Sequence, residues 1–447
     1  MIQAISIIIV ATVLIAGGFF LFSTSGHEMT ITHAPDGTGT QTTSASTSKQ
    51  DTETSTIAEN VSESDTTLPT PANVYYADIE PQKPLSNPPT TIKAVYSTSW
   101  TAATPNNLER LIGLIKRTEL NAIVIDIKDF SGAILYDAHL PELDRYHTKE
   151  VRIRNINAVI KRLHDEGIYV IARQTVFQDP ALAKARPDLA LKNISGLATS
   201  TSVQDAPVWK DDKGLAWMDP AAKEVWDYNI AIAREASSRG FDEINFDYVR
   251  FASDGSLGNI GYPFYNPVTT LKKNVIKNFF AYLREETAGI IISADLFGLT
   301  TVNSDDLGIG QSLEIAAEYF DYVGPMTYPS HYARGFNGYK NPAEYPYEVL
   351  EYSMQKAKER LMAQTKTSVI TLSDGTTTTE TVAAKPKYRA KLRPWLQDFD
   401  LGADYDAKKV RAQISAVEKV LGDTPLFNGW FLWDPRNIYT EGALLSE

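Results

Sequence analysis

The five residues Glu243-Ile244-Asn245-Phe246-Asp247 alternate strictly between polar and apolar side chains. Side chains of a β-strand point in turn to its two faces, so this segment predicts a strand with one apolar and one polar face. In a parallel sheet covered by helices, the apolar face packs against the helices. Asp247 is therefore expected to end the strand facing inward, at the carboxyl end where sites of parallel barrels lie.

Short β-branched or aromatic runs surround this segment, and helical periodicities separate them, which is typical of βα units. We expect eight strands, at residues 92–97, 122–127, 168–173, 243–247, 290–295, 322–327, 389–395 and 427–433. Helices are expected at residues 107–118, 153–166, 221–238, 268–286, 311–319, 347–364 and 407–421. This order predicts an α/β fold, a (β/α)8 TIM barrel whose last helix is short or absent.

The alternative arrangement is an open, doubly wound sheet, which usually carries a glycine-rich phosphate loop after its first strand. Here that strand is followed by Tyr96-Ser97-Thr98-Ser99-Trp100, so the barrel is favoured and no cofactor is expected. Two insertions interrupt the pattern. Residues 187–217 follow the third strand and are expected at the carboxyl rim. Residues 365–386 precede the seventh strand and are expected to form a hairpin at the opposite face.

The same alternation brings polar side chains together at one rim of the barrel. A charge inside a barrel costs several kcal/mol unless it is paired or solvated, so such a cluster indicates a functional site. A structural role stays open for some members, since Asp126 could pair with Arg173 or Lys128, and Asp295 could cap a turn. The residues expected to face inward are Asp126, Lys128, Arg173, Glu243, Asn245, Asp247, Ser293, Asp295, Trp395 and Gln397.

Aromatic residues follow or end several of the predicted strands. Flat rings stack on the apolar faces of sugars, although they also fill ordinary cores. Arg173 and Arg250 are candidates for holding Asp247 ionised. Together with the acidic rim, this pattern suggests a polysaccharide substrate. The residues expected to contact it are Asp126, Arg173, Arg250, Tyr328, His331, Trp395, Gln397 and Trp433.

Composition excludes several other classes of site. The 447 residues contain no cysteine, which rules out disulfides, thiolate metal sites and a cysteine nucleophile. The six histidines form no close pair, so no metal site is expected. The formal net charge of -12 argues against nucleic acid as a partner, because phosphates need a basic surface.

The first 91 residues differ from the rest. Residues 2–22 carry no charge and are rich in Ile, Val, Ala and Phe, which predicts a transmembrane anchor at residues 1–22. A cleaved signal peptide is the alternative reading. Of the 51 residues 23–73, 22 are Ser or Thr, and prolines follow, so residues 23–91 are expected to form a flexible stalk. The domain at residues 92–447 is therefore expected outside the cytoplasm, on the membrane or secreted.

Five motifs resemble a bacterial family of uncharacterised glycoside-hydrolase-like domains over roughly residues 92–440. They are residues 216–220 (Ala-Trp-Met-Asp-Pro), 241–251 (Phe-Asp-Glu-Ile-Asn-Phe-Asp-Tyr-Val-Arg-Phe), 293–298 (Ser-Ala-Asp-Leu-Phe-Gly), 324–329 (Gly-Pro-Met-Thr-Tyr-Pro) and 429–435 (Gly-Trp-Phe-Leu-Trp-Asp-Pro). That family is similar to the TIM barrels of α-amylases and α-galactosidases. The resemblance implies a glycoside hydrolase with Asp247 as the nucleophile at the end of strand 4.

The same resemblance leaves the general acid open. The α-amylase type carries a Glu on strand 5, where this chain has Asp295. The α-galactosidase type carries its acid on strand 6, where this chain offers Met326, Thr327 and Tyr328. Our hypothesis is retaining hydrolysis with Asp247 as nucleophile and Asp295 as acid. A non-catalytic glycan-binding barrel is the alternative, and a metal-dependent deacetylase at His331 is a weaker one.

Overall fold

The structure is a computed structural model that describes residues 78–197, 202–363, 366–371, 377–382 and 386–446. The predicted anchor at residues 1–22 and the stalk up to residue 77 lie outside these residues and stay predictions. Among the helices that the structure describes, none has the length and apolar character needed to cross a bilayer.

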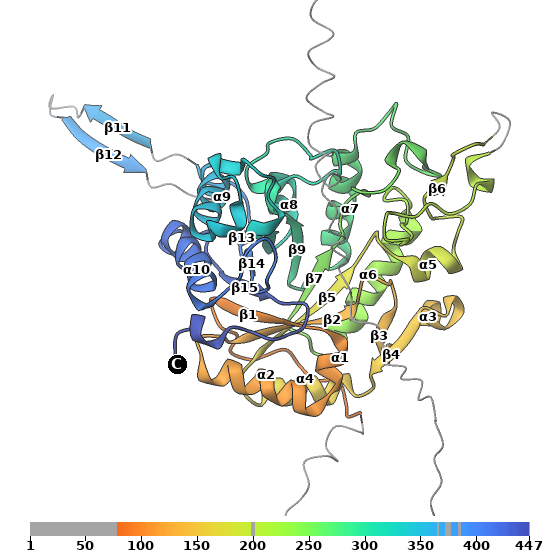
Figure 1. Cartoon of the computed structure of the whole chain (residues 1–447), viewed down its shortest axis with the longest axis horizontal. Helices are drawn as coiled ribbons and strands as arrows, with labels where there is room; N and C mark the ends of the chain where they lie inside the picture. Colours follow the sequence, from red (N-terminus) through yellow and green to blue (C-terminus); the bar gives the residue numbers. More distant parts are fainter. Residues whose placement is uncertain (1–77, 198–201, 364–365, 372–376, 383–385, 447) are drawn as a thin grey trace, which may run out of the picture. The chain divides into compact units, whose positions relative to one another are not determined.

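Eight parallel strand positions close into a barrel, as predicted (Figure 1). Going round the ring, β1 pairs with β2, β2 with β5, and the series continues through β7, β9, β10, β14 and β15, which pairs again with β1. Their bounds are Ile92–Ser97 (β1), Ala122–Lys128 (β2), Tyr169–Thr175 (β5), Glu243–Asp247 (β7), Ile292–Phe297 (β9), Tyr322–Met326 (β10), Trp395–Gln397 (β14) and Gly429–Trp433 (β15).

The seventh position is broken, which the sequence pattern did not predict. A two-residue strand, β13 (Lys391–Leu392), pairs with β10, and β14 resumes the pairing at Trp395. Arg393 and Pro394 lie between them, and proline has no N–H to donate to a neighbouring strand. The single strand expected at residues 389–395 is therefore two short ones.

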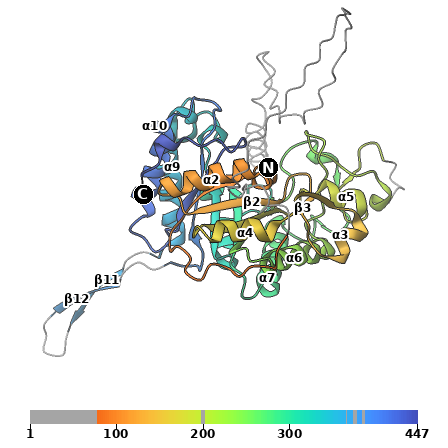
Figure 2. The ribbon, with the colours of Figure 1, turned by 90° about the horizontal axis from the view of Figure 1, so that it is seen from below.

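Seven helices surround the barrel where helices were expected (Figures 1 and 2). They are α2 (Pro105–Arg117), α4 (Ile156–His164), α6 (Lys223–Ser238), α7 (Lys272–Glu286), α8 (Leu313–Tyr319), α9 (Pro346–Leu361) and α10 (Ala407–Leu421). After β15, residues 434–446 contain only a short 3-10 helix at Glu441–Ala443. No α-helix follows β15 within these described residues.

Several smaller elements were missed. After β2, the chain forms β3 (Ile134–Tyr136), α3 (Pro141–Tyr146) and β4 (Lys149–Ile153), so the next helix begins later than expected. A short helix, α1 (Ser99–Ala103), follows β1. Three more short elements follow later barrel strands, namely α5 (Pro180–Ala185) and β6 (Lys192–Asn193) after β5 and β8 (Ile260–Gly261) after β7. The hairpin expected within residues 365–386 is present as β11 (Lys366–Thr371) and β12 (Thr377–Val382).

The alternation rule sorts the core into two layers. Ile244 and Phe246 of β7 belong to the larger apolar cluster, between the strands and the helices. A smaller cluster lies inside the barrel and includes Ala94, Val124 and Phe431. Polar side chains of β7 lie on the same inner side, so the predicted inward face of this strand is confirmed.

Residues 78–91 pack on the barrel without forming a helix or strand. The backbone N–H of Leu85 donates to Asp242, which precedes β7, and Asn428, which precedes β15, donates to the carbonyl oxygen of Thr90. The side chain of Leu85 packs against the inner apolar cluster. The segment therefore covers the amino-terminal end of the barrel.

Gly429 begins β15 at a position that tolerates no side chain. Its φ is +100°, and a Cβ there would overlap the carbonyl oxygen of Ile92 on the paired strand. Both strain and overpacking oppose a larger residue, so we expect Gly429→Ala to lower the free energy of unfolding by about 3 kcal/mol in urea denaturation. Gly258→Ala is the control, because no atom lies within 4 Å of its Cβ position. Equal stability of the two variants would contradict the prediction.

Candidate active site

Asp247 ends β7 and lines a pocket at the carboxyl rim of the barrel. Its Oδ2 accepts a hydrogen bond from Arg173 Nη2 at 2.5 Å, and its Oδ1 accepts one from the backbone N–H of Tyr248, also at 2.5 Å. Tyr248 has a φ of +53°, a left-handed conformation that turns the chain away immediately after the strand. The carboxylate is thus fixed at both oxygens while its side chain borders the pocket.

Arg173 of β5 binds more than one carboxyl group. Its Nη1 donates to Asp126 Oδ1 at 2.6 Å, and its Nε lies 3.8 Å from Asp295 Oδ2. We name Arg173 with Asp126, Asp247 and Asp295 the Arg173 cluster. Burial alone lowers the pKa of the guanidinium, but the charges of Asp126 and Asp247 raise it well above its usual value. Arg173 is therefore a fixed positive charge between the acidic groups.

Asp295 of β9 lies one strand away from Asp247. Phe246 pairs with Ala294 in the register of β7 and β9, so the two aspartates are the next residues on adjacent strands. Asp295 Oδ1 accepts hydrogen bonds from Trp395 Nε1 at 2.7 Å and from Asn245 Nδ2 at 3.0 Å. Burial and the negative charge of Asp247 raise the pKa of Asp295 to about 8. At neutral pH, Asp295 is therefore mainly protonated.

Gly324 of β10 makes room for this carboxyl group. A Cβ on Gly324 would lie 2.8 Å from Asp295 Oδ1 and 3.2 Å from Trp395 Nε1. Any larger residue would displace one of these two side chains. The glycine thus allows three neighbouring strands to converge on Asp295.

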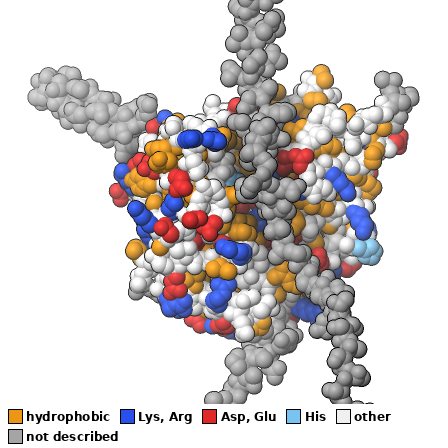
Figure 3. All heavy atoms as spheres, viewed as in Figure 1, with side chains coloured by type: hydrophobic (Ala, Val, Ile, Leu, Met, Phe, Trp, Pro, Cys, Tyr) orange, Lys and Arg blue, Asp and Glu red, His pale blue; other side chains and the backbone are white. Residues whose placement is uncertain are grey.

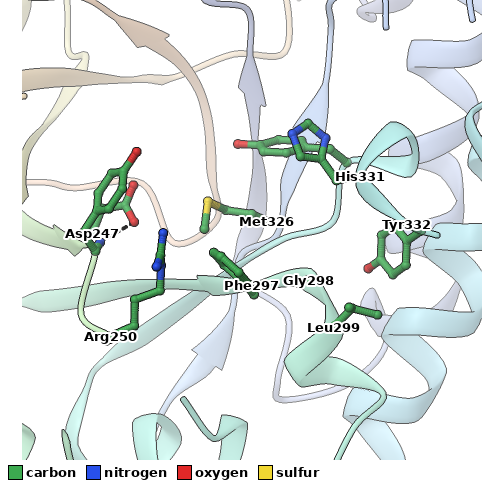
Figure 4. A pocket seen from close by; sticks show the side chains of 10 residues that line it. Asp247, Arg250, Phe297, Gly298, Leu299, Met326, His331 and Tyr332 are labelled. Carbon is green, nitrogen blue, oxygen red and sulfur yellow. Dashed lines mark hydrogen bonds between the residues drawn. The ribbon is translucent and has the colours of Figure 1, made fainter. Parts of the chain in front are cut away.

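The pocket has a volume of about 340 Å³ (Figure 4). Asp247, Tyr248 and Arg250 line it from the end of β7, and Tyr328 and His331 line it from the segment after β10. Between these polar groups lies an apolar wall made by Phe297, Leu299 and Met326. A pocket of this size with a few convergent polar groups can enclose a small ligand.

The sequence-predicted residues fall into two groups. Asp247, Arg250, Tyr328 and His331 line the pocket. The other predicted residues lie deeper or beside it and are not among the residues that line it, namely Asp126, Arg173, Asp295, Trp395, Gln397 and Trp433. Their assignment to catalysis or substrate binding stays a prediction.

These residues contact one another and neighbouring segments outside the lining of the pocket. Trp395 is buried and donates to Asp295, as described above. Gln397 is buried and accepts from the backbone N–H of Ser330, which holds the segment after β10. Trp433 stacks on Tyr96 with ring centroids 3.9 Å apart. Tyr96 in turn donates to Asp126 Oδ2 at 2.5 Å.

Lys128 does not face into the barrel, contrary to the alternation rule. The pairing of β2 with β5 shifts between Asp126 and Lys128, so the strand bulges there. Lys128 Nζ instead lies 2.7 Å from Asp179 Oδ2 and 3.1 Å from Asn229 Oδ1 on α6, fully buried. Asp126 consequently pairs with Arg173 and not with Lys128.

Two features of the site were missed by sequence reasoning. Arg393, in the break of the seventh strand position, binds Glu243 of β7 with nitrogen–oxygen distances of 3.1–3.2 Å, and both are buried. The apolar wall was also missed, although the alternation rule applied to β10 would have placed Met326 inward. In the described residues, no three His, Asp or Glu side chains are arranged to hold a metal ion.

A family model described as "Putative glycosyl hydrolase domain" matches residues 94–439. A hypothetical protein from Ruminiclostridium thermocellum ATCC 27405 is 34% identical over 48% of this chain and 98% of its own, with a TM-score of 0.40. The glycoside hydrolase domain of PgaB (BpsB) from Bordetella bronchiseptica is 13% identical over 78% of this chain and 95% of its own, with a TM-score of 0.50.

The α-galactosidase TtGalA from Thermus thermophilus is 12% identical over 80% of this chain and 60% of its own, with a TM-score of 0.44. No curated protein sequence matches the chain. The similarity to PgaB agrees with the barrel fold described above, and the family match runs from within β1 to beyond β15. The chain therefore belongs to the family of glycosyl hydrolase domains that this model describes.

Proposed function

We propose that the barrel hydrolyses glycosidic bonds of a polysaccharide with retention of configuration. The observation that carries this proposal is Asp247, an aspartate at the end of the fourth barrel strand that is fixed at both oxygens and lines a pocket. The family match supports the same class of reaction.

Asp247 is the nucleophile in this proposal. One of its carboxylate oxygens forms a bond to the anomeric carbon while the bond from that carbon to the leaving oxygen breaks. The hydrogen bonds from Arg173 and from the N–H of Tyr248 fix the orientation of the carboxylate before attack. Water then adds to the anomeric carbon and releases Asp247.

Asp295 is the general acid. Its raised pKa keeps a proton available at neutral pH, which goes to the leaving oxygen in the first step and is regained from water in the second. Because Arg173 lies near both carboxyl groups, their facing oxygens are within about 9 Å of each other. This upper bound includes the separation of about 5–5.5 Å that retaining glycosidases use.

Replacing Asp295 by Asn should remove the descending limb of the plot of kcat/KM against pH. Above about pH 8 the wild-type acid loses its proton, so kcat/KM is expected to fall as pH rises, and Asp295→Asn is expected to abolish that fall. The variant should hydrolyse polysaccharide about 10²-fold more slowly but lose much less on a dinitrophenyl glycoside, whose leaving group needs no proton.

The matched control is Asp398→Asn, a buried aspartate whose pKa is raised to about 7, mainly by burial, and which is bonded to Thr440 outside the pocket. Its pH profile should keep the descending limb. Equal losses of Asp295→Asn on both kinds of substrate would assign Asp295 a purely structural role.

One observation favours the second candidate, a glycan-binding barrel without catalysis. Asp295 is only 1% exposed and does not line the pocket, so its proton has to reach the leaving oxygen from below the pocket surface. Binding of an oligosaccharide without release of reducing ends by the wild-type protein would support this candidate.

The sequence of residues 1–91 supports a polysaccharide outside the cytoplasm as the substrate, because an apolar segment and a Ser/Thr-rich stalk precede the domain. Protection of the domain from protease added to intact spheroplasts would contradict this location.

A further inference from the structure

Arg250 differs from the other buried arginines. Four described arginines are less than 9% exposed, and three of them have a carboxylate within 4 Å. Arg173 binds Asp126 and Asp247, and the remaining pairs are Arg239 with Glu235 and Arg393 with Glu243. Arg250 is 7% exposed, and no carboxylate of the described residues lies within ion-pair distance of it. Its buried charge has no carboxylate partner among the described residues.

Aromatic rings hold this guanidinium in place. Its central carbon lies 4.6 Å from the ring centre of Phe297, 4.7 Å from that of Trp217 and 5.3 Å from that of Tyr248. Nη1 donates to the carbonyl oxygen of Phe251 and to Ser253 Oγ, both at 3.0 Å. These contacts fix the plane of the side chain, and fixing that plane prepares it to bind a flat anion at two points.

The rest of the guanidinium is directed toward the pocket. Arg250 lines the pocket beside Asp247, and Figure 4 shows its nitrogen end between Asp247 and Met326. Burial lowers the pKa of Arg250, since the charges of nearby acids do not offset the loss of water. An anionic ligand group would restore the missing partner, whereas a neutral hydroxyl would do so only in part.

We propose that Arg250 binds the carboxylate of a uronic acid, so that the pocket selects acidic polysaccharides. This inference rests on the proposed function, because it places the sugar with its anomeric carbon at Asp247. The carboxylate carbon of a uronic acid is three bonds from the anomeric carbon, so one ring can contact both Asp247 and Arg250. Arg173 already neutralises part of the charge of Asp247, which reduces the repulsion between the two anions.

Recognition of an acidic sugar has to come from Arg250 itself and not from the charge of the surrounding surface. On the face of the molecule drawn in Figure 3, Lys and Arg side chains are interspersed with Asp and Glu, without a large positive area. The chain as a whole has a net charge of -12, which repels acidic polymers at long range. A desolvated arginine within the pocket is therefore the feature that can favour an acidic sugar.

The test compares 4-nitrophenyl glycuronides of gluco, galacto and manno configuration, in both anomers, with their methyl esters. The ester has nearly the same shape but no charge. We expect the full-length protein to hydrolyse one uronide with a kcat/KM at least 10-fold above that of its ester. Arg250→Gln should reduce this ratio about 10- to 100-fold, mainly through a higher KM, and Arg250→Lys should reduce it less.

The control variant is Arg334→Gln, an exposed arginine after β10, which should leave the ratio unchanged. The ratio of kcat/KM for the uronide to kcat/KM for its ester is measured on the wild-type protein alone. The test therefore holds even if Arg250→Gln fails to fold. Hydrolysis of the esters as fast as the uronides would overturn this inference and leave the proposed function standing.

If no glycoside of the set is hydrolysed, calorimetric binding of oligouronides separates the two ideas. Binding that Arg250→Gln weakens at least 10-fold and Arg334→Gln does not weaken would support the role of Arg250 while counting against hydrolysis. Absence of binding by the wild-type protein would overturn the inference.

Discussion

Asp247→Asn is expected to lower kcat/KM for polysaccharide hydrolysis by at least about 10³-fold. The amide has nearly the same shape as the carboxylate but cannot form the glycosyl ester, so the loss reports chemistry and not packing. Reducing-end release measures the rate, and circular dichroism with urea denaturation checks that the variant is folded. A 2-fluoro glycosyl fluoride should label the wild-type protein at Asp247, which mass spectrometry of its peptides would detect.

The matched control is Asp305→Asn, which removes the charge of an exposed aspartate on the loop after β9. This variant should keep near wild-type activity, because the Asp305 side chain accepts a hydrogen bond from the backbone N–H of Leu307 and does not line the pocket. If Asp247→Asn kept more than about a tenth of the wild-type activity, Asp247 would not be the nucleophile.

Arg173→Gln should lower the free energy of unfolding by about 3–5 kcal/mol, because it leaves buried carboxyl groups without their positive partner. Activity should also fall, since Asp247 loses the bond that holds Oδ2. Urea denaturation measures the first effect and reducing-end release the second. The stability loss should become smaller as pH falls, because burial raises the pKa of Asp126 and protonation of this group removes its unpaired charge.

Arg186→Gln is the control for this prediction. Arg186 also binds two carboxylates, Asp188 at 2.7 Å and Glu224 at 2.9 Å, but those carboxylates are exposed to water. Exposed ion pairs contribute about 0–1 kcal/mol, so this variant should be close to wild type. A loss of the same size in both variants would show that burial of the Arg173 cluster does not matter for its energy.

The barrel could be predicted because periodicity alone identifies its units. β1 and β7 lie at the predicted residues, and so does α10. Strand ends were less certain where the apolar run extends beyond the strand, as at residues 290–291, which precede β9. Apolar side chains at such positions are compatible with either a strand or the loop before it.

The inward position of Asp126, Arg173, Asp247 and Asp295 followed from the same periodicity. The periodicity did not predict how deeply these side chains are buried. Alternation states which face of the strand a side chain lies on, but not how far other groups cover it. Asp295 is covered by Trp395, a residue 100 positions later in the chain. Contacts between such distant residues leave no local pattern in a sequence.

Lys128 shows the limit of the alternation rule. One extra residue in β2 reverses the face of every later side chain, and nothing in the run from residue 122 to 128 marks the bulge. The strands at residues 134–136 and 149–153 were missed for a related reason. They are short, they lie outside the ring, and only their pairing with β2 and with each other makes them strands.

The sharing of Arg173 among three acids has an evolutionary consequence. A descendant that lost Asp247 by mutation would inherit an arginine with one partner fewer, and further changes at Asp126 or Arg173 would then restore the balance of charge. We therefore expect relatives that lack one of these residues to have replaced the others as well. Members that differ at a single one of them should be rare in natural lineages.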